Sequence, residues 1–246
     1  MTASRPSFPF VYKVIAGFNI VLFVAQLFMG GDLMSPSTQH LVAWGANVAP
    51  LSLSGEAWRL FASMFLHIGL IHLGFNMYML IVFGPIVERQ FGPVRFTLVY
   101  LISGLIGSLV SALVHAAPGQ VVIAAGASGA LMGISGAFLG HWLVAGARHD
   151  QQEQISVRGP LAQTIGLTLL LGFINPGVDN ACHIGGLIGG AILGGAFALG
   201  SFEQNAVKRA IATAAISAGG LFCVYLALNA PPSNGLLELR AQMQAR

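Results

Sequence analysis

The sequence is poor in charge and in cysteine, and each shortage excludes a class of protein. Only 8% of the 246 residues are charged, whereas about 25% is typical of a soluble domain. The mean hydropathy is +0.77, so a water-soluble globular protein is excluded. The two cysteines, Cys182 and Cys223, both lie in apolar segments, which indicates neither a disulfide framework nor a zinc pattern.

Aspartate is also scarce, which limits the chemistry available inside a membrane. The three aspartates, Asp32, Asp150 and Asp179, all lie outside the apolar runs. An aspartyl intramembrane protease needs two carboxyl groups that share a proton, so that class is excluded. A zinc protease would need His-Glu-x-x-His, but His67 and His72 have no acid between them. We therefore expect no metal and no cofactor.

What the sequence does contain is a series of apolar runs. A spanning helix needs about 20 mostly apolar residues. Seven apolar windows of 16–21 residues, each with at most one charged residue, predict seven spans in a single membrane domain covering residues 1–246. We expect an all-α polytopic helix bundle of seven spans, followed by a tail at 230–246 without an assigned role. The predicted spans are 12–30, 68–87, 95–115, 127–147, 160–175, 182–200 and 209–229.

Lysine and arginine predict how the bundle is oriented. Cytoplasmic loops of membrane proteins carry an excess of these residues. With a cytoplasmic N-terminus, eight basic residues fall inside and three fall outside, so we expect that topology, in a cytoplasmic or plasma membrane. The pI near 9.2 then reflects charges that flank the spans, not a nucleic-acid partner. The inner residues are Arg5, Lys13, Arg89, Arg95, Arg148, Arg158, Lys208 and Arg209, and the outer ones are Arg59, Arg240 and Arg246.

Glycine recurs at intervals of four in the fourth and sixth predicted spans. The pairs are Gly129/Gly133 and Gly136/Gly140 in the fourth span and the series Gly186/Gly190/Gly194 in the sixth. This spacing lets two helix backbones approach closely in lipid. We therefore expect these two helices to be neighbours.

Polar side chains inside the apolar runs are candidates for a functional site, because burying them in lipid is costly. The second span contains His72 and Asn76, which share one helix face. His183 lies near the outer start of the sixth span. A single histidine of this kind is more often a packed side chain than a catalytic one, but three polar groups at similar depth favour a site.

The stretch GASGALMGISGAF offers two serines, Ser128 and Ser135, in the same Gly-x-Ser-Gly frame. Seven residues place them on roughly the same helix face but about 10 Å apart along the axis. Only Ser128 lies at the outer start of its helix, level with His183 and close to water. We therefore expect Ser128 to be a nucleophile with His183 as its base, and Ser135 to be a packing residue.

Acyl transfer also needs donors that stabilise the developing oxyanion. The backbone N–H of Ser128 is free at a helix start, and His72 and Asn76 can donate from the second span. We interpret Asp179 and Asn180 mainly as N-cap residues of the sixth helix. Asp179, four residues before His183, is the one acid that could also orient the base, and the sequence favours a Ser–His dyad over a triad with Asp179.

Together these residues resemble the rhomboid family of intramembrane serine proteases. The matching motifs are WR (58–59), HIGLIHLGFN (67–76), VERQFG (87–92), GASGA (126–130) and HIGGLIGG (183–190). The resemblance covers about 55–200, with 12–30 as a first helix. It implies a six-helix core at 12–200, with the helix at 209–229 as an added seventh. It implies that Ser128 is the nucleophile, His183 the base, and His72 and Asn76 the oxyanion stabilisers. It further implies hydrolysis of single-span membrane proteins in or near the bilayer, with an active site open to the outer side.

One position departs from the family pattern, and two other functions stay open. Met132 stands where family members often carry an aromatic residue beneath the histidine. A catalytically inactive relative that binds or escorts membrane proteins would lack the serine or the histidine, and both are present. A transporter or channel would carry polar groups along a path to both sides, whereas the polar residues here gather in the outer half.

Overall fold

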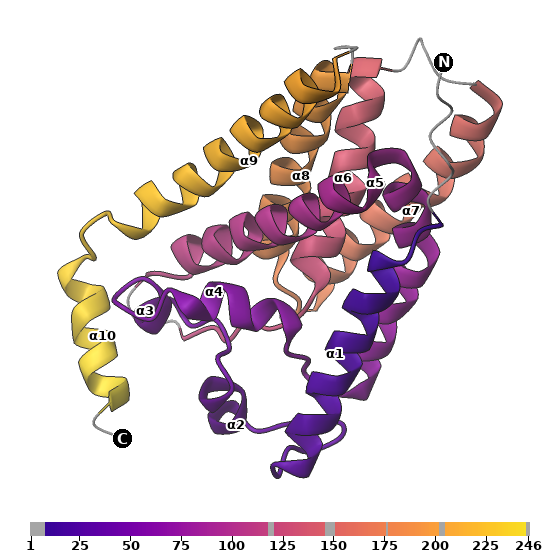
Figure 1. Ribbon diagram of the computed structural model, residues 1–246. Helices are drawn as coiled ribbons and strands as arrows, with labels where there is room; N and C mark the ends of the chain where they lie inside the picture. Colours follow the sequence, from indigo (N-terminus) through magenta and orange to yellow (C-terminus); the bar gives the residue numbers. More distant parts are fainter. Residues whose placement is uncertain (1–7, 118–120, 146–150, 176, 202–204, 245–246) are drawn as a thin grey trace.

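The computed structural model describes residues 8–117, 121–145, 151–175, 177–201 and 205–244. Regular structure in these ranges is helical, apart from one isolated antiparallel bridge between Asn47 and Ala124. The expected all-α class is therefore confirmed (Figure 1). The helices are α1 (Val11–Phe28), α2 (Thr38–Ala43), α3 (Ala49–Ser52), α4 (Trp58–Ala62), η1 (Ser63–Phe65), α5 (Leu70–Val114), α6 (Ser128–Ala145), α7 (Gln151–Ile174), α8 (Asn180–Ser201), α9 (Ala206–Leu228) and α10 (Asn234–Gln244).

Five helices in the described part of the chain are long and apolar enough to cross a membrane: α1, α5, α6, α8 and α9. α5 has 45 residues and is broken at Gly92, whose φ is 76°, so it contains two helical arms that meet at an angle. The apolar part of α7, Gly159–Ile174, is shorter. The protein is thus a multi-pass membrane protein, and the count of seven spans stays a prediction.

The predicted boundaries differ most from the observed ones at α7. This helix begins at Gln151, well before the predicted span at residue 160, and continues through Pro160. Hydropathy detects only the apolar part of a helix, so a polar first turn escapes it. Arg5, Arg148 and Arg246, which were used to orient the chain, lie outside the described residues.

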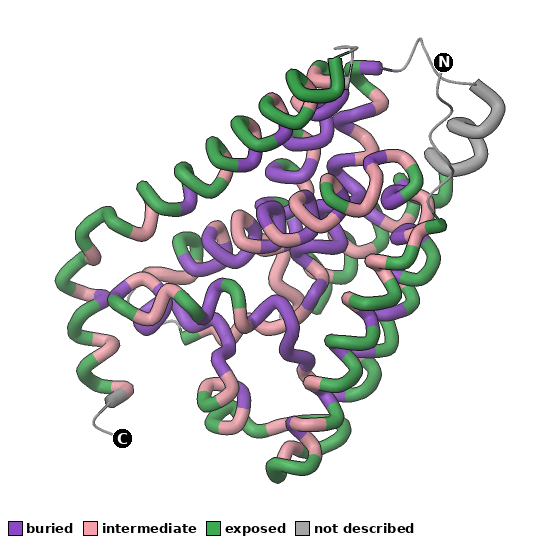
Figure 2. The backbone as a smooth tube through the Cα atoms, viewed as in Figure 1, coloured by how far each residue is buried: buried purple, intermediate pink, exposed green. Residues whose placement is uncertain are grey.

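The two arms of α5 and the glycine-rich helices α6 and α8 form the centre of the bundle. A Cβ atom on Gly190 would meet the carbonyl oxygen of Gly133, and one on Gly186 would meet that of Gly129. The predicted contact between these two helices is therefore confirmed. Figure 2 shows buried residues concentrated in the middle of the bundle and exposed ones along α1 and α9. Many exposed side chains are large and apolar, as Phe18 and Ile211 are, which suits a lipid-facing surface.

The first helix is held by the turn at the end of the first arm of α5. The buried carboxylate of Glu88 accepts hydrogen bonds from the backbone N–H groups of Phe10, Val11 and Tyr12, at 2.9, 3.0 and 3.0 Å. These N–H groups begin α1 and have no acceptor within the helix. Glu88 therefore caps α1 from a position far along the chain.

The long connection between α1 and α5 folds into the short helices α2, α3, α4 and η1 and is fastened by Arg59. The side chain of Arg59 donates to the carbonyl oxygens of Val42 at 2.7 Å and Ala46 at 3.3 Å, and pairs with Glu56 at 2.8 Å. The WR motif of the sequence thus has a structural consequence: Arg59 ties this connection together.

Candidate active site

Ser128 is the first residue of α6, and the segment before it is tied to the α1–α5 connection. Asn47 and Ala124 exchange two backbone hydrogen bonds of 2.9 Å, and the N–H of Gly126 donates to the carbonyl oxygen of Ser63 at 2.9 Å. These bonds fix where the chain enters α6. Ser128 therefore lies at the start of its helix, as the sequence predicted, and is half-buried.

His183 of α8 contacts Ser128 directly. Its Nε2 lies 2.8 Å from the Ser128 hydroxyl oxygen, and the residue is only 4% exposed. The close glycine contacts between α6 and α8 allow this distance, since larger residues would hold the two backbones apart. In the described part of the chain the other ring nitrogen, Nδ1, has no hydrogen-bond partner.

Asp179 positions the start of α8 and does not bond to the His183 ring. One carboxylate oxygen accepts the N–H of Cys182 at 3.0 Å, as an N-cap does, and the other accepts the hydroxyl of Ser111. Asn180 was expected to cap this helix too, but its side chain instead donates to the carbonyl oxygen of Leu169 in α7 at 3.0 Å. Asp179 thus acts as a cap, and Asn180 links two helices.

The His72 ring and the Ser128 hydroxyl both border the space that a side chain at Gly126 would fill. A Cβ atom on Gly126 would lie 2.9 Å from His72 Nε2 and 3.7 Å from the Ser128 hydroxyl oxygen. The Nδ1 of His72 accepts the backbone N–H of Ile68 at 3.3 Å. A neutral imidazole that accepts at Nδ1 carries its proton on Nε2. His72 therefore presents a donor N–H on the side of the ring that faces Gly126.

Asn76 lies one turn further along the same face of α5 and is buried. Its Nδ2 donates to the backbone carbonyl oxygen of His72 at 2.8 Å. This bond uses one of the two N–H groups of the amide. Asn76 thus shares a face with His72, but its amide donates within its own helix and not to Ser128.

Three other residues considered in the sequence analysis, Ser135, Met132 and His67, are buried in the bundle. Ser135 is fully buried and its hydroxyl donates to the carbonyl oxygen of Leu131 at 2.9 Å, two turns away from the Ser128–His183 contact. Met132 is 1% exposed and packs in a cluster with Phe83 of α5 and Leu161 of α7. His67 is fully buried, with its ring centroid 5.3 Å from that of His72.

Sequence reasoning missed the residues that support the site from a distance. Asn47 holds the segment before Ser128, and its side chain also donates to the carbonyl oxygen of Ser108 at 2.8 Å. Ser111 holds Asp179. No pattern in the sequence marks either residue, because each one acts through contacts with distant segments.

The chemistry open to this arrangement follows from its donors and acceptors. Among the described residues, no group of three or more His, Cys, Asp or Glu side chains could hold a metal ion. A serine hydroxyl in hydrogen-bond contact with an imidazole is the arrangement that activates serine as a nucleophile. A helical multi-pass membrane protein with a Ser–His pair at one end of its bundle is the class that this fold and this site define.

Comparison with known proteins assigns the family. A family model described as a Rhomboid domain matches residues 54–199. The chain belongs to the rhomboid family.

Three relatives illustrate this similarity. Rhomboid protease GluP of Bacillus subtilis is 36% identical over 194 residues, which cover 76% of this chain and 34% of that protein. RHOMBOID-like protein 6, mitochondrial, of Arabidopsis thaliana is 41% identical over 169 residues, which cover 68% and 53%. Rhomboid protease AarA of Providencia stuartii is 35% identical over 191 residues, which cover 71% and 67%. The chain therefore spans only about a third to a half of the length of the first two.

Proposed function

We propose that the protein is an intramembrane serine endopeptidase in which Ser128 is the nucleophile and His183 is the general base. The observation that carries this proposal is the 2.8 Å contact between His183 Nε2 and the Ser128 hydroxyl oxygen. His183 takes the hydroxyl proton as Ser128 attacks the peptide carbonyl and then returns that proton to the leaving amine. Since Nδ1 of His183 has no partner among the described residues, the pair works as a dyad.

The oxyanion formed in this step needs donors, and three groups around Ser128 can supply them. These are the backbone N–H of Ser128 at the start of α6, the Nε2–H of His72 and the second N–H of the Asn76 amide. The first N–H groups of a helix have no intrahelical acceptor and carry the positive end of its dipole. The bond between Ile68 and His72 fixes the tautomer that makes His72 a donor.

Substrates of this site are membrane proteins with a single spanning segment, cut in or near the bilayer. The Ser128–His183 pair lies at the start of α6 and near the start of α8, which brings it close to the membrane surface and to water. Two of the relatives carry the word protease in their names. With the N-terminus in the cytoplasm, as the basic residues favour, the site opens to the outer side of the membrane. Neither a metal nor a cofactor takes part.

Replacing the two dyad residues tests the proposal. Ser128→Ala and His183→Ala should each reduce cleavage of a single-span model substrate in liposomes by about 10⁴-fold or more. His72→Phe removes one oxyanion donor, so kcat should fall by about 10²–10³-fold with little change in substrate binding. A serine-reactive fluorophosphonate should label the unmodified protein and not the Ser128→Ala variant.

Ser135→Ala is the matched control, because Ser135 lies on the same helix and bonds only within it. It should retain near-normal cleavage. Full turnover by Ser128→Ala would overturn the choice of nucleophile. A folded, unmodified protein that neither cleaves nor labels would instead indicate a catalytically inactive relative that binds membrane proteins.

A further inference from the structure

Asp179 is held close to His183, although no hydrogen bond joins the two side chains. Its backbone carbonyl oxygen accepts the N–H of His183 at 3.1 Å, so Asp179 lies one turn before His183 at the start of α8. One oxygen of its carboxylate accepts the N–H of Cys182, the residue directly before His183, at 3.0 Å. The carboxylate is therefore fixed beside the same turn of α8 that carries the base.

The hydrogen bonds of the Asp179 carboxylate leave its negative charge uncompensated. Its second oxygen accepts the hydroxyl of Ser111, which lies near the end of the second arm of α5. Both donors, a backbone N–H and a hydroxyl, are neutral groups. They hold the carboxylate in place without cancelling its charge.

The ring of His183 extends over the turn that contains Asp179. Side chains of a helix tilt toward its N-terminus, so each one covers the turn before it. The carboxylate of Asp179 and the ring of His183 accordingly interact electrostatically. The Nε2 of His183 reaches Ser128 in α6. Its Nδ1, the ring nitrogen closer to the backbone of α8, is buried and has no partner among the described residues.

The other titratable groups near His183 carry no negative charge at neutral pH. His72 interacts with it from the first arm of α5, and His67 lies beside His72. Cys182 belongs to α8 itself, and His115 directly follows the second arm of α5. A histidine is never negative in this range, and a thiol ionises only near pH 8.5. The described side chains of α7, residues 159–175, contain no titratable group.

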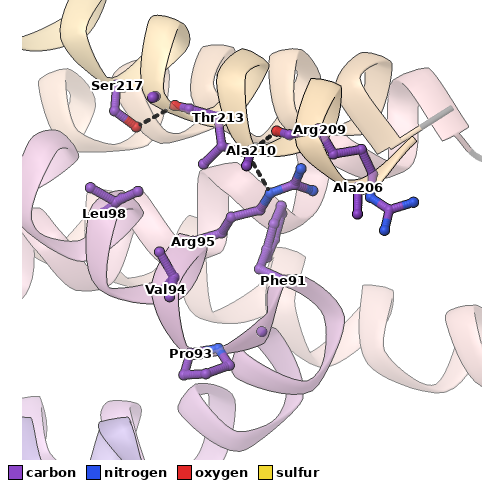
Figure 3. Close-up of a pocket in the computed structure, with 12 residues that line it drawn as sticks. Phe91, Pro93, Val94, Arg95, Leu98, Ala206, Arg209, Ala210, Thr213 and Ser217 are labelled. Atoms are coloured by element: carbon purple, nitrogen blue, oxygen red, sulfur yellow. Dashed lines mark hydrogen bonds between the residues drawn. The ribbon is translucent and has the colours of Figure 1, made fainter. Parts of the chain in front are cut away.

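The other charged side chains of the described residues are distant, paired or exposed. Arg95 and Arg209 line a groove between α9 and the second arm of α5 (Figure 3). Arg95 precedes Ser111 by 16 residues on that arm, which is about 24 Å along the helix. The acidic side chains of the α1–α5 connection and of α10 are exposed to water or paired with arginine: Asp32, Glu56 and Glu238. These charges therefore act on the base less than the carboxylate at the start of α8 does.

We propose that Asp179 is a positioning residue that acts on His183 through its charge, an inference that rests on the proposed protease function. The negative charge favours the tautomer with its proton on Nδ1, which leaves the lone pair of Nε2 free to accept the Ser128 hydroxyl proton. It also stabilises the imidazolium that forms as Ser128 attacks the substrate. The proton itself moves only from Ser128 to His183 and from there to the leaving amine.

Asp179→Asn tests this role, because asparagine caps a helix as well as aspartate does and carries no charge. For a single-span model substrate, kcat at pH 7 should fall about ten-fold with little change in KM. The acidic limb of the pH profile of kcat should move about one pH unit lower. The direction follows because His183 must be neutral to accept the proton, and it is harder to protonate once the nearby negative charge is lost. Asp179→Ser, another good cap, should move the limb equally.

Two control variants separate the charge from its surroundings. Ser111→Ala removes one hydrogen bond and keeps the carboxylate. Asp32→Asn makes the same replacement at an exposed turn, where the carboxylate accepts the N–H groups of Met34 and Ser35 at 2.8 and 2.7 Å. Neither variant should move the acidic limb. An unmoved limb in both Asp179 variants would overturn the proposal, as would an equal movement in Ser111→Ala or Asp32→Asn.

Nitrogen NMR of the full-length protein with ¹⁵N-labelled histidine tests the same inference without a substrate. The signals of His183 are assigned by their loss in His183→Ala, and the fraction of neutral rings with the proton on Nδ1 is measured. This fraction should be high in the unmodified protein and lower in Asp179→Asn, and equal fractions would overturn the proposal. A protein that shows the difference but does not cleave would contradict the proposed function and still support the action of Asp179 on His183.

Discussion

Gly126 leaves room for His72 near Ser128, because it has no side chain in the space that both of them border. Its φ is +141°, a value that residues with a side chain rarely adopt. The His72 ring occupies the space that a Cβ would need, at 2.6 Å from His72 Cε1. The backbone of this residue thus sets the distance between the nucleophile and a proposed oxyanion donor.

Gly126→Ala should therefore impair catalysis more than it impairs folding. The new methyl group forces the His72 ring away from Ser128 and strains the backbone by roughly 1–3 kcal/mol. We expect kcat to fall by about 10²-fold, within the range for loss of one oxyanion donor, with the protein still folded. The control is Gly74→Ala on α5, where a Cβ would meet nothing within 4 Å. Equal kcat values for the two variants would contradict this account.

At the scale of single residues, much of the candidate site could be predicted from the sequence, because the depth of a residue in the membrane can be counted along its helix. Ser128 and His183 each lie near the start of a helix, and counting residues along two apolar runs is enough to place them level. The bonds from Ile68 to His72 and from Asn76 to the His72 carbonyl oxygen could not be predicted. They depend on side-chain rotamers and on a loop conformation that no residue pattern encodes.

At the scale of elements, the contact between α6 and α8 holds the dyad together. Gly133, Gly136 and Gly140 of α6 all face backbone or small side chains of neighbouring helices at distances that leave no room for a Cβ. The spacing of the glycines predicted this contact, since small residues at intervals of four form one flat strip along a helix. The break in α5 at Gly92 falls between the predicted spans 68–87 and 95–115, whereas the start of α7 was harder to predict, because its polar first residues leave no hydropathy signal.

Gly190→Ala should loosen this contact. Its methyl group would meet the carbonyl oxygen of Gly133, so α6 and α8 must move apart at a cost of roughly 1–3 kcal/mol. We expect a lower midpoint of thermal unfolding in detergent and slower cleavage, because the Ser128–His183 distance lengthens. Gly166→Ala on α7 provides the comparison: a Cβ there meets nothing within 4 Å, and alanine is favoured over glycine in a helix by up to about 1 kcal/mol. A lowered midpoint in both variants would show that the contact between α6 and α8 is not the cause.

At the scale of the whole molecule, contacts lead from the C-terminal helix to the segment before Ser128. Arg240 of α10 lies 3.8 Å from Glu56, and Glu56 pairs with Arg59 at 2.8 Å. Arg59 in turn holds the carbonyl oxygen of Ala46, and the next residue, Asn47, pairs with Ala124. Residues 230–246 could not be assigned a role from the sequence, because the partners of α10 lie far away along the chain.

Leu236 and Leu237 are adjacent in α10 and differ in burial, which provides a test of this arrangement. Leu236 is 5% exposed and packs with Ala49, Leu60 and Val224, whereas Leu237 is 45% exposed. Leu236→Ala leaves a cavity between α10 and the α1–α5 connection, which should lower the free energy of unfolding by about 2–3 kcal/mol. Because that connection also fixes the chain before Ser128, limited proteolysis between residues 31 and 66 and a loss of cleavage activity should accompany the lower stability. Leu237→Ala should change none of these properties. If Leu236→Ala lowered stability and left the connection protected, α10 would stabilise the bundle without supporting the segment that enters α6.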